Sequence, residues 1–248
     1  MNKPTHLSKA DNIYASALTE VRQFSFNQQV VDVFPDMINR SVPGYAHIID
    51  GIGKIAQMHC SNNAHIYDLG CSLGAASLSI AKYLCDSQIR IDAVDISPEM
   101  VAKCELNKAS FSYGKSITVH HGNVIDYRLE QCDMVVLNFT LQFIPPEQRL
   151  AIMQKIYASL KPGGVLVLSE KVAHSNSYIE ETIVTLHHDF KRQNGYSDLE
   201  ISQKRSALED VMKLDTTAQH QQRMAEAGFV NSAVWQQQFN FLSFIAIK

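Results

Sequence analysis

The sequence predicts a single α/β domain, spanning residues 1–248, in which helices cover both faces of a mostly parallel sheet. Three observations support this prediction. The chain has 248 residues, of which 46% are hydrophobic, so it can bury a large core. Between residues 64 and 169, short apolar runs alternate with amphipathic helical patterns. The short runs are apolar almost throughout, as strands are when helices cover both faces of their sheet.

Five apolar runs are interpreted as the strands of this sheet. Each has the length of a buried strand and ends at a turn signal or a polar residue. They span residues 64–69, 90–95, 117–121, 134–138 and 165–169. Because the carboxyl ends of parallel strands meet at one edge of the sheet, ligands of such folds bind there. The residues that follow each strand are therefore the first candidates for a site.

The segments between the strands carry helix signals. After the first strand, apolar residues recur at helical spacing from Leu73 to Leu84. After the second, Ser97 is placed to cap a helix that begins at Pro98. A later helix begins at Pro146 and ends before residues 161–164 (KPGG), which cannot continue it.

Two segments lie outside this alternation. Residues 1–45 precede the first strand and are predicted to form a helical lid segment with turns. Residues 171–222 are polar with helical periodicity, and are predicted to form a helical insertion after the fifth strand. Within the insertion, Ser197 and Glu200 have the spacing of a capping box, which predicts a helix start.

The end of the sequence is predicted to complete the sheet. A helix is expected at residues 218–227, followed by Gly228 as its stop signal. Two β-rich runs then follow, at 232–235 and 239–247. We interpret them as a hairpin that adds an antiparallel strand to the sheet.

Composition and charge exclude several classes of protein. The 22 Lys and Arg residues are outnumbered by 25 Asp and Glu residues, so a broad basic face for direct nucleic-acid binding is not expected. No apolar run reaches the length of a membrane span, and residues 1–12 lack the apolar stretch of a signal peptide. The five cysteines show no metal-binding spacing and are odd in number, which predicts a reduced, cytoplasmic protein without a metal.

A glycine-rich turn follows the first strand. Residues 68–74 (DLGCSLG) have the spacing D-x-G-x-S-x-G. Small residues let backbone N–H groups approach a ligand closely, next to the positive end of a helix. An ordinary tight turn between a strand and a helix is the alternative interpretation.

Polar residues follow the next three strands. Asp95 is placed to accept hydrogen bonds from two ribose hydroxyls, although it could simply stabilise a helix N-terminus. Asn123 could accept from an adenine amino group, and the Val124 N–H could donate to a ring nitrogen. Asn138 is either a loop cap or a ligand contact. Together these strand ends predict a nucleoside site.

This pattern resembles the Rossmann-like class I S-adenosylmethionine-dependent methyltransferases. The resemblance covers residues 55–170 and the closing hairpin, which corresponds to the antiparallel strand at the end of that fold. Ser72 stands where the family usually has glycine, and Asn123 where it often has aspartate. Both keep the capacity to hydrogen-bond, so the predicted binding site is unaffected.

Strings outside the common core are similar to one family within this superfamily, the carboxy-S-adenosyl-L-methionine synthases. They lie at residues 33–38, 40–45, 67–76, 135–143, 187–192 and 200–206. The resemblance implies S-adenosyl-L-methionine as the cofactor and prephenate as the second substrate. It implies carboxy-S-adenosyl-L-methionine and phenylpyruvate as the products. It further implies a homodimer whose product serves a tRNA carboxymethyltransferase that makes wobble uridine 5-oxyacetic acid.

Carried over by position, the resemblance also implies a set of cofactor contacts. They are Tyr45, Gly70, Cys71, Ser72, Asp95, Ile96, Asn123, Val124, Asn138 and Arg205. Arg205 is expected to hold the product carboxylate through two parallel hydrogen bonds. On spacing alone, a solvated helix face is the favoured interpretation of residues 204–205, and only the resemblance reverses this preference.

Some roles are left open by the sequence. No catalytic base is assigned, while Arg40, Lys191 and Arg192 are candidate cations for the carboxylates of prephenate. His187 and His188 are interpreted as structural or surface residues, because neighbours on a helix point about 100° apart and do not easily share one ion. The alternative functions are a conventional methyltransferase and a non-catalytic S-adenosylmethionine-binding partner of a tRNA-modifying enzyme.

Overall fold

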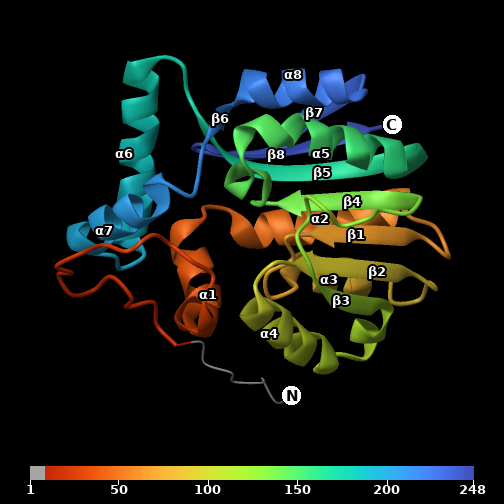
Figure 1. Ribbon diagram of the computed structural model, residues 1–248, viewed down its shortest axis with the longest axis horizontal. Coiled ribbons are helices and arrows are strands. Elements are labelled where there is room, and N and C mark those ends of the chain that lie inside the picture. The colour runs from red at the N-terminus through yellow and green to blue at the C-terminus, as the bar shows by residue number, and fades with distance from the viewer. Residues whose placement is uncertain (1–8) are drawn as a thin grey trace.

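The computed structural model describes residues 9–248, so the first eight residues of the predicted lid segment lie outside it (Figure 1). The helices are α1 (Gln28–Ser41), α2 (Tyr45–His59), α3 (Ala75–Tyr83), α4 (Pro98–Ala109), α5 (Pro146–Ser159), α6 (Ser177–Gln193), α7 (Asp198–Glu209) and α8 (Thr217–Ala227). Two short 3-10 helices are η1 (Ser112–Ser116) and η2 (Leu141–Phe143). The strands are β1 (His65–Leu69), β2 (Arg90–Asp95), β3 (Ile117–His121), β4 (Cys132–Asn138), β5 (Leu160–Ala173), β6 (Asp215–Thr216), β7 (Asn231–Gln238) and β8 (Phe241–Ile247).

The strands form one sheet in the order β3-β2-β1-β4-β5-β8-β7, with β6 paired to β5 outside this path. The first five strands along the chain are parallel, whereas β8 is antiparallel to β5 and β7 is antiparallel to β8. The predicted mostly parallel sheet with an antiparallel C-terminal hairpin is therefore confirmed.

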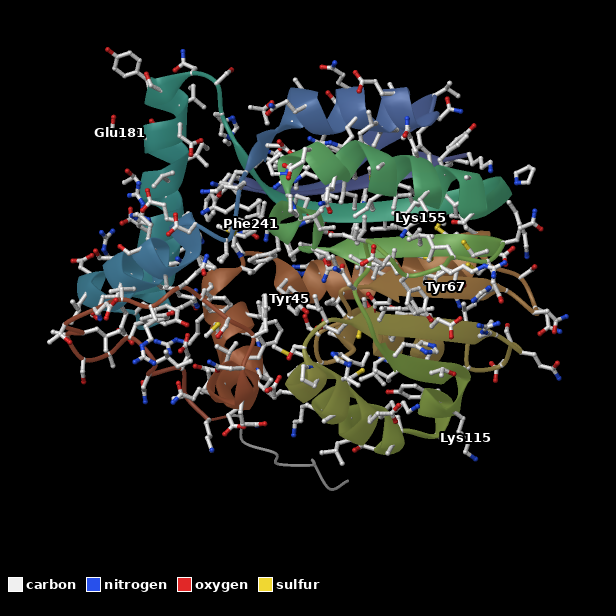
Figure 2. All side chains as sticks on the ribbon, viewed as in Figure 1. Tyr45, Tyr67, Lys115, Lys155, Glu181 and Phe241 are labelled. Atoms are coloured by element: carbon white, nitrogen blue, oxygen red, sulfur yellow. The ribbon has the colours of Figure 1, made fainter. Side chains whose placement is uncertain are left out.

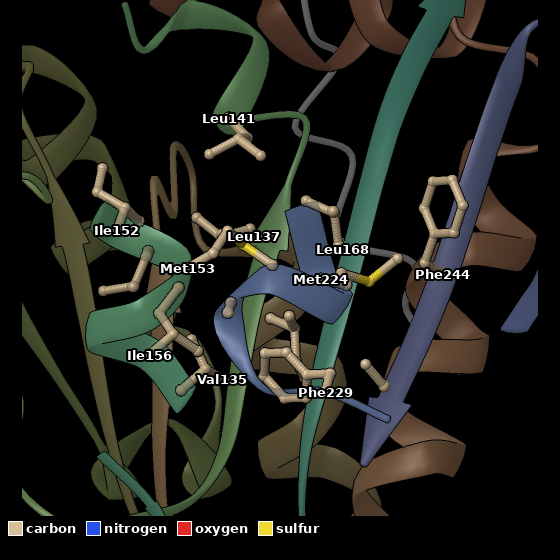
Figure 3. Close-up of a cluster of buried hydrophobic side chains, with 14 of the residues drawn as sticks. Val135, Leu137, Leu141, Ile152, Met153, Ile156, Leu168, Met224, Phe229 and Phe244 are labelled. Atoms are coloured by element: carbon tan, nitrogen blue, oxygen red, sulfur yellow. The ribbon is translucent and has the colours of Figure 1, made fainter. Parts of the chain in front are cut away.

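Helices cover both faces of the sheet. On one face, α5 and α8 pack together over β4, β5 and β8, and Figure 3 shows the buried side chains that fill this layer. Leu137, Met153, Leu168 and Phe244 are almost fully buried there. On the other face, α2 and α3 pack against each other, with Ile52 and Ile80 fully buried between them and the sheet.

The predicted start and stop signals act as expected. The Ser97 hydroxyl accepts a hydrogen bond from the Met100 N–H, with Pro98 in the first turn of α4. Ser197 and Glu200 form the predicted capping box of α7. Gly228 ends α8 in the left-handed conformation, with φ +114°.

Strand β5 and helix α2 show the main departures from the predictions. Strand β5 begins at Leu160 rather than Val165, because the chain passes from α5 directly into the sheet and Leu160 pairs with Cys132. A register shift between Cys132 and Met134 accommodates the KPGG segment. Helix α2 was not predicted as a separate element, although Ile48, Ile52 and Ile55 already have helical spacing.

Three helices lie beyond the carboxyl ends of the strands. In Figure 1, α1, α6 and α7 lie together at the left, on the side to which the arrowhead of β4 points. Helix α6 contacts both α1 and α7. Residues 9–27, which we call the N-terminal arm, contact the helical insertion, where the Phe24 N–H donates to the Ala207 carbonyl at 2.9 Å. The segments outside the core alternation thus meet beyond the carboxyl edge of the sheet. No helix in residues 9–248 combines the length and apolar character that crossing a membrane requires.

Candidate active site

Two adjoining cavities lie at the carboxyl ends of β1, β2 and β4. Their shared wall consists of Phe26, Gly70, Ser72, Phe139 and Phe143. A ligand that occupies both cavities would therefore pass directly over the glycine-rich turn. We call them the nucleoside cavity, which Asp95 lines, and the lysine cavity, which Lys171, Lys191 and Lys204 line.

The nucleoside cavity brings together the predicted ends of β2 and β3. Asp95, Ile96, Asn123 and Val124 all line it. The Asp95 carboxylate is buried and accepts hydrogen bonds from the Ser72 N–H at 2.8 Å and the Ser97 N–H at 2.9 Å. Burial raises the pKa of Asp95, while these backbone donors oppose the shift. The Ile96 side chain is 61% exposed, which leaves an apolar surface for a planar base.

Asn123 has a local role as well as its predicted one. Its side-chain oxygen accepts a hydrogen bond from the Ile125 N–H at 3.0 Å, and its carbonyl accepts from the N–H groups of Asp126 and Tyr127. A carboxamide oxygen has two lone pairs, so a ligand amino group would use the second.

The glycine-rich turn has the backbone that its composition predicts. Gly70, Ser72 and Gly74 have φ values of +83°, +48° and +82°, in the left-handed region that favours glycine. A Cβ at residue 70 would lie 2.3 Å from the Thr140 Oγ1, so a side chain there requires Thr140 to move. The turn is anchored by Asp68, which accepts hydrogen bonds from the Ser77 hydroxyl and N–H. Burial raises the pKa of Asp68 to about 6.

Tyr45, Cys71 and Asn138 line the lysine cavity, on the other side of the turn. The Asn138 side-chain oxygen is buried and accepts no hydrogen bond from any of residues 9–248. A buried acceptor without a partner is costly, so this oxygen fits a ligand that brings a donor, such as an amino acid ammonium group. The Cys104 thiol and burial hold the pKa of the Cys71 thiol well above its usual range. The N–H groups of Gly70 and Cys71, which were predicted to face a ligand, both donate to the Val94 carbonyl, at 2.8 and 3.0 Å.

Aromatic side chains form the apolar wall of the lysine cavity. They are Phe24, Phe26, Phe34, Phe139, Phe143 and Phe241. Figure 2 shows Tyr45 and Phe241 in the region between the helical insertion and the ends of the strands. Phe24 and Phe26 come from the N-terminal arm, ahead of α1. Their contribution was not predicted, because no local pattern links residues this distant in sequence to the strand ends.

His187 is a structural residue of this cavity. Its Nε2 lies 2.8 Å from the Ser41 carbonyl, so Nε2 is the protonated nitrogen and donates. Burial, Lys191 and Lys171 lower the pKa of His187 to about 2, so the ring is neutral at physiological pH.

Within residues 9–248 there is no group of three or more side chains suited to hold a metal ion.

The structure places the predicted cations in different surroundings. Lys191 is buried and lines the lysine cavity. Arg40 instead donates to the Asn194 carbonyl at 2.7 Å and lies over the Tyr196 ring. Arg192 is exposed and pairs with Asp189 and Asp198.

Arg205 lies outside both cavities, on an exposed part of α7. Its neighbour Lys204 points inward instead and is only 6% exposed. Sequence reasoning missed Lys204 and Lys171 as cavity residues. The signal for Lys204 was its spacing from Ile201 and Leu208, which places these three residues on one helical face.

Comparison with known proteins identifies the family. A methyltransferase-domain family model matches residues 66–164. The carboxy-S-adenosyl-L-methionine synthase of Colwellia psychrerythraea is 49% identical over 243 residues, which cover 98% of this chain and 100% of that protein. The enzyme of the same name from Citrifermentans bemidjiense is 51% identical over 241 residues, covering 97% and 99%. The chain belongs to the carboxy-S-adenosyl-L-methionine synthase family.

The family predicted from the sequence is thereby confirmed, and solved structures agree with the fold. A putative S-adenosyl-L-methionine-dependent methyltransferase from Methanococcus maripaludis superimposes with a TM-score of 0.60 at 21% identity, covering 94% of this chain and 97% of that one. The strings outside the common core on which the resemblance rests, at residues 33–38, 40–45, 187–192 and 200–206, include residues that line the site. They contribute Phe34, Lys191 and Lys204 to the cavity lining.

Proposed function

We propose that this chain converts S-adenosyl-L-methionine and prephenate to carboxy-S-adenosyl-L-methionine and phenylpyruvate. The observation that carries the proposal is the pairing of the two cavities across the glycine-rich turn. One has the acceptors for an adenosyl group, and the other combines an aromatic wall with three lysines. A conventional methyltransferase needs no such cluster of cations beside its methyl group.

Each part of S-adenosyl-L-methionine would have a partner in the chain. The Asp95 carboxylate would accept from the ribose hydroxyls, and Asn123 and Val124 would contact the adenine. The Asn138 oxygen would accept from the ammonium group, beside the glycine-rich turn. When bound, the cofactor supplies a sulfonium-bound methyl group as the carbon that receives the carboxyl group.

The chain would act on prephenate by position and exclusion of water. The aromatic wall fits its six-membered ring, and the lysine ammonium groups fit its carboxylates. Burial of both substrates in one enclosed space would bring the reacting carbons together and keep bulk water away. No side chain is assigned as a base. The hydroxide that leaves the prephenate ring together with CO2 would take up the methyl proton as water, and the methyl carbon would then form its new bond to that CO2.

We further propose, from the family, that the protein is a cytoplasmic homodimer and does not contact nucleic acid directly. Its product would be the donor for a tRNA carboxymethyltransferase that completes wobble uridine 5-oxyacetic acid. Gel filtration with light scattering tests the dimer, and loss of the modified uridine on deletion of the gene tests the tRNA role.

Prephenate labelled with ¹³C in its ring carboxyl group tests the reaction. The purified protein is incubated with labelled prephenate and S-adenosyl-L-methionine, and the products are read by mass spectrometry. Labelled carboxy-S-adenosyl-L-methionine together with phenylpyruvate supports the proposal. S-adenosylhomocysteine formed only with an added acceptor indicates a methyltransferase, and unchanged substrates indicate a binding protein; either result overturns it.

A further inference from the structure

We infer that Lys171 and Lys191 form a dicarboxylate-recognition site, in which each ammonium group takes one carboxylate of the second substrate. In this site, Lys204 acts as a positioning residue that is already paired within the chain. The inference rests on the proposed function and deepens it, because it assigns the substrate class to particular side chains.

The three lysines reach the cavity from three different elements. Lys171 lies near the end of β5, Lys191 on α6 and Lys204 on α7. Lys191 and Lys204 are only 9% and 6% exposed, and all three line the same cavity. Lysines are rarely buried unless they are paired, so Lys191 and Lys204, beside the partly exposed Lys171, need a chemical explanation.

The charges in this cavity do not balance. Lys204 has its own partners, since its ammonium group lies 3.0 Å from the Ser41 hydroxyl and 3.4 Å from the Asp11 carboxylate. In residues 9–248, no acidic group lies within 4.0 Å of the ammonium group of Lys171 or Lys191, and neither ammonium group donates a hydrogen bond. The Lys171 ammonium has only the Phe241 ring, at 5.8 Å.

The nearby carboxyl groups do not neutralise these two cations. Burial lowers the pKa of Lys171, and Glu180 opposes this shift while accepting a hydrogen bond from the His174 N–H. Asp11 is shared by Lys204 and Tyr196. Asp68 is occupied by Ser77. Two lysine side chains therefore remain without a counter-charge. A ligand carboxylate beside Lys191 would hold this side chain in its charged form.

Two uncompensated cations favour a ligand with two negative charges. A monocarboxylate would leave one buried ammonium group without a counter-charge, which is unfavourable in a site of low polarity. A dicarboxylate satisfies both, and the aromatic wall holds the ring to which the carboxylates are attached. The two lysines without a counter-charge therefore favour a dicarboxylate as the second substrate.

A matched pair of probes tests this selection. Benzylsuccinate and 4-phenylbutanoate both carry a phenyl ring, and the second lacks one carboxylate. Their affinities are measured by calorimetry with S-adenosylhomocysteine present, so that no turnover occurs. We expect wild type to bind benzylsuccinate at least about tenfold more tightly, and Lys171→Met and Lys191→Met each to lose most of this ratio.

Lys115→Met serves as the control, because Lys115 is exposed and lies far from the site, at the lower right of Figure 2. Lys115→Met should keep the wild-type ratio of the affinities for benzylsuccinate and 4-phenylbutanoate. If Lys171→Met and Lys191→Met also keep this ratio, the inference is overturned.

Thermal unfolding separates recognition from a structural role. Lys191 is a buried lysine without a counter-charge. In the absence of ligand, Lys191→Met should therefore leave the midpoint temperature of unfolding unchanged or raise it. A lowered midpoint, together with an equal loss of affinity for both probes, would mean that Lys191 only supports the fold, and the inference would be wrong.

The test of the lysine assignment can fail independently of the test of the proposed function. If labelled product forms but the variants keep the wild-type probe ratio, the reaction stands and the lysine assignment fails. If the variants lose the ratio but wild type forms no product from prephenate, the dicarboxylate site stands and the substrate is a different dicarboxylate.

Discussion

The Asp95 carboxylate accepts a hydrogen bond from the Ser72 backbone N–H at 2.8 Å, which joins the end of β2 to the turn that follows β1. One side chain thereby holds the glycine-rich turn and lines the nucleoside cavity. The residue predicted to bind the ribose is thus also a support of the turn beside it.

Asp95→Ala is expected to weaken S-adenosylhomocysteine binding by at least about tenfold, because the ribose hydroxyls lose a charged acceptor. The turn also loses the Ser72 contact, so the true loss should exceed this figure. Calorimetry measures the affinity, and exposed Asp86→Ala is the control. Unchanged affinity in Asp95→Ala would remove this residue from the site.

Gly70→Ala should abolish cofactor binding, since its Cβ would meet Thr140 and its φ of +83° is unfavourable for alanine. The matched control is Gly163→Ala, where φ is +79° but nothing lies within 4 Å of the added Cβ. The control should lose only the backbone cost of about 1–2 kcal/mol and keep full binding. Urea unfolding and calorimetry on both variants give the comparison; equal binding in the two would contradict the role of the turn.

We expect the buried Lys191 side chain to make the free energy of unfolding depend on pH. Burial, Lys204 and Lys171 lower its pKa to about 7, while Asp11 opposes the shift. In the unfolded chain a lysine keeps its proton up to about pH 10. Between these values the unfolded state binds more protons, so the free energy of unfolding contributed by this group rises with pH.

Urea unfolding of wild type and Lys191→Met at pH 7 and pH 9 checks this dependence. Wild type should gain roughly 1–2 kcal/mol relative to the variant over that interval. Other titrating groups are common to both proteins and largely cancel in the difference. Equal changes in the two proteins would show that Lys191 is not a buried cation with a lowered pKa.

Arg205→Ala tests the role that the family resemblance implies for this residue. If the guanidinium holds the product carboxylate, the variant should bind carboxy-S-adenosyl-L-methionine more weakly, with less effect on S-adenosyl-L-methionine. Because Arg205 is exposed, the selective loss should be below about tenfold. Arg205→Lys should restore only part of it, since an ammonium group lacks the bidentate fork. An unchanged ratio of the two dissociation constants would exclude Arg205 from carboxylate recognition.

The sequence predicted where several cavity residues lie, because these residues come at the ends of strands. In a parallel sheet, a residue that comes directly after a strand must lie at the carboxyl edge, whatever the rest of the chain does. Asp95, Asn123 and Asn138 were found in this way, and all three line the cavities.

The lysine cavity was less predictable because its residues come from segments packed over that edge. Phe24 is placed by a contact with Ala207, 183 positions later in the chain, which no local pattern reveals. On α7, a difference of one residue turns a side chain by about 100°, so the choice between Lys204 and Arg205 depended on the buried face of the helix. The positions of Ile201 and Ala207 on that face decide it.

The antiparallel hairpin has a consequence for the order in which the chain can fold. Strand β7 is synthesised before β8, yet it pairs in the sheet only with β8, which lies between β7 and β5. A nascent chain on the ribosome therefore cannot dock β7 until β8 has emerged, and the edge of β5 stays open until then. Phe241, the first residue of β8, also lines the lysine cavity. The strand that completes the sheet therefore also completes the wall of the cavity.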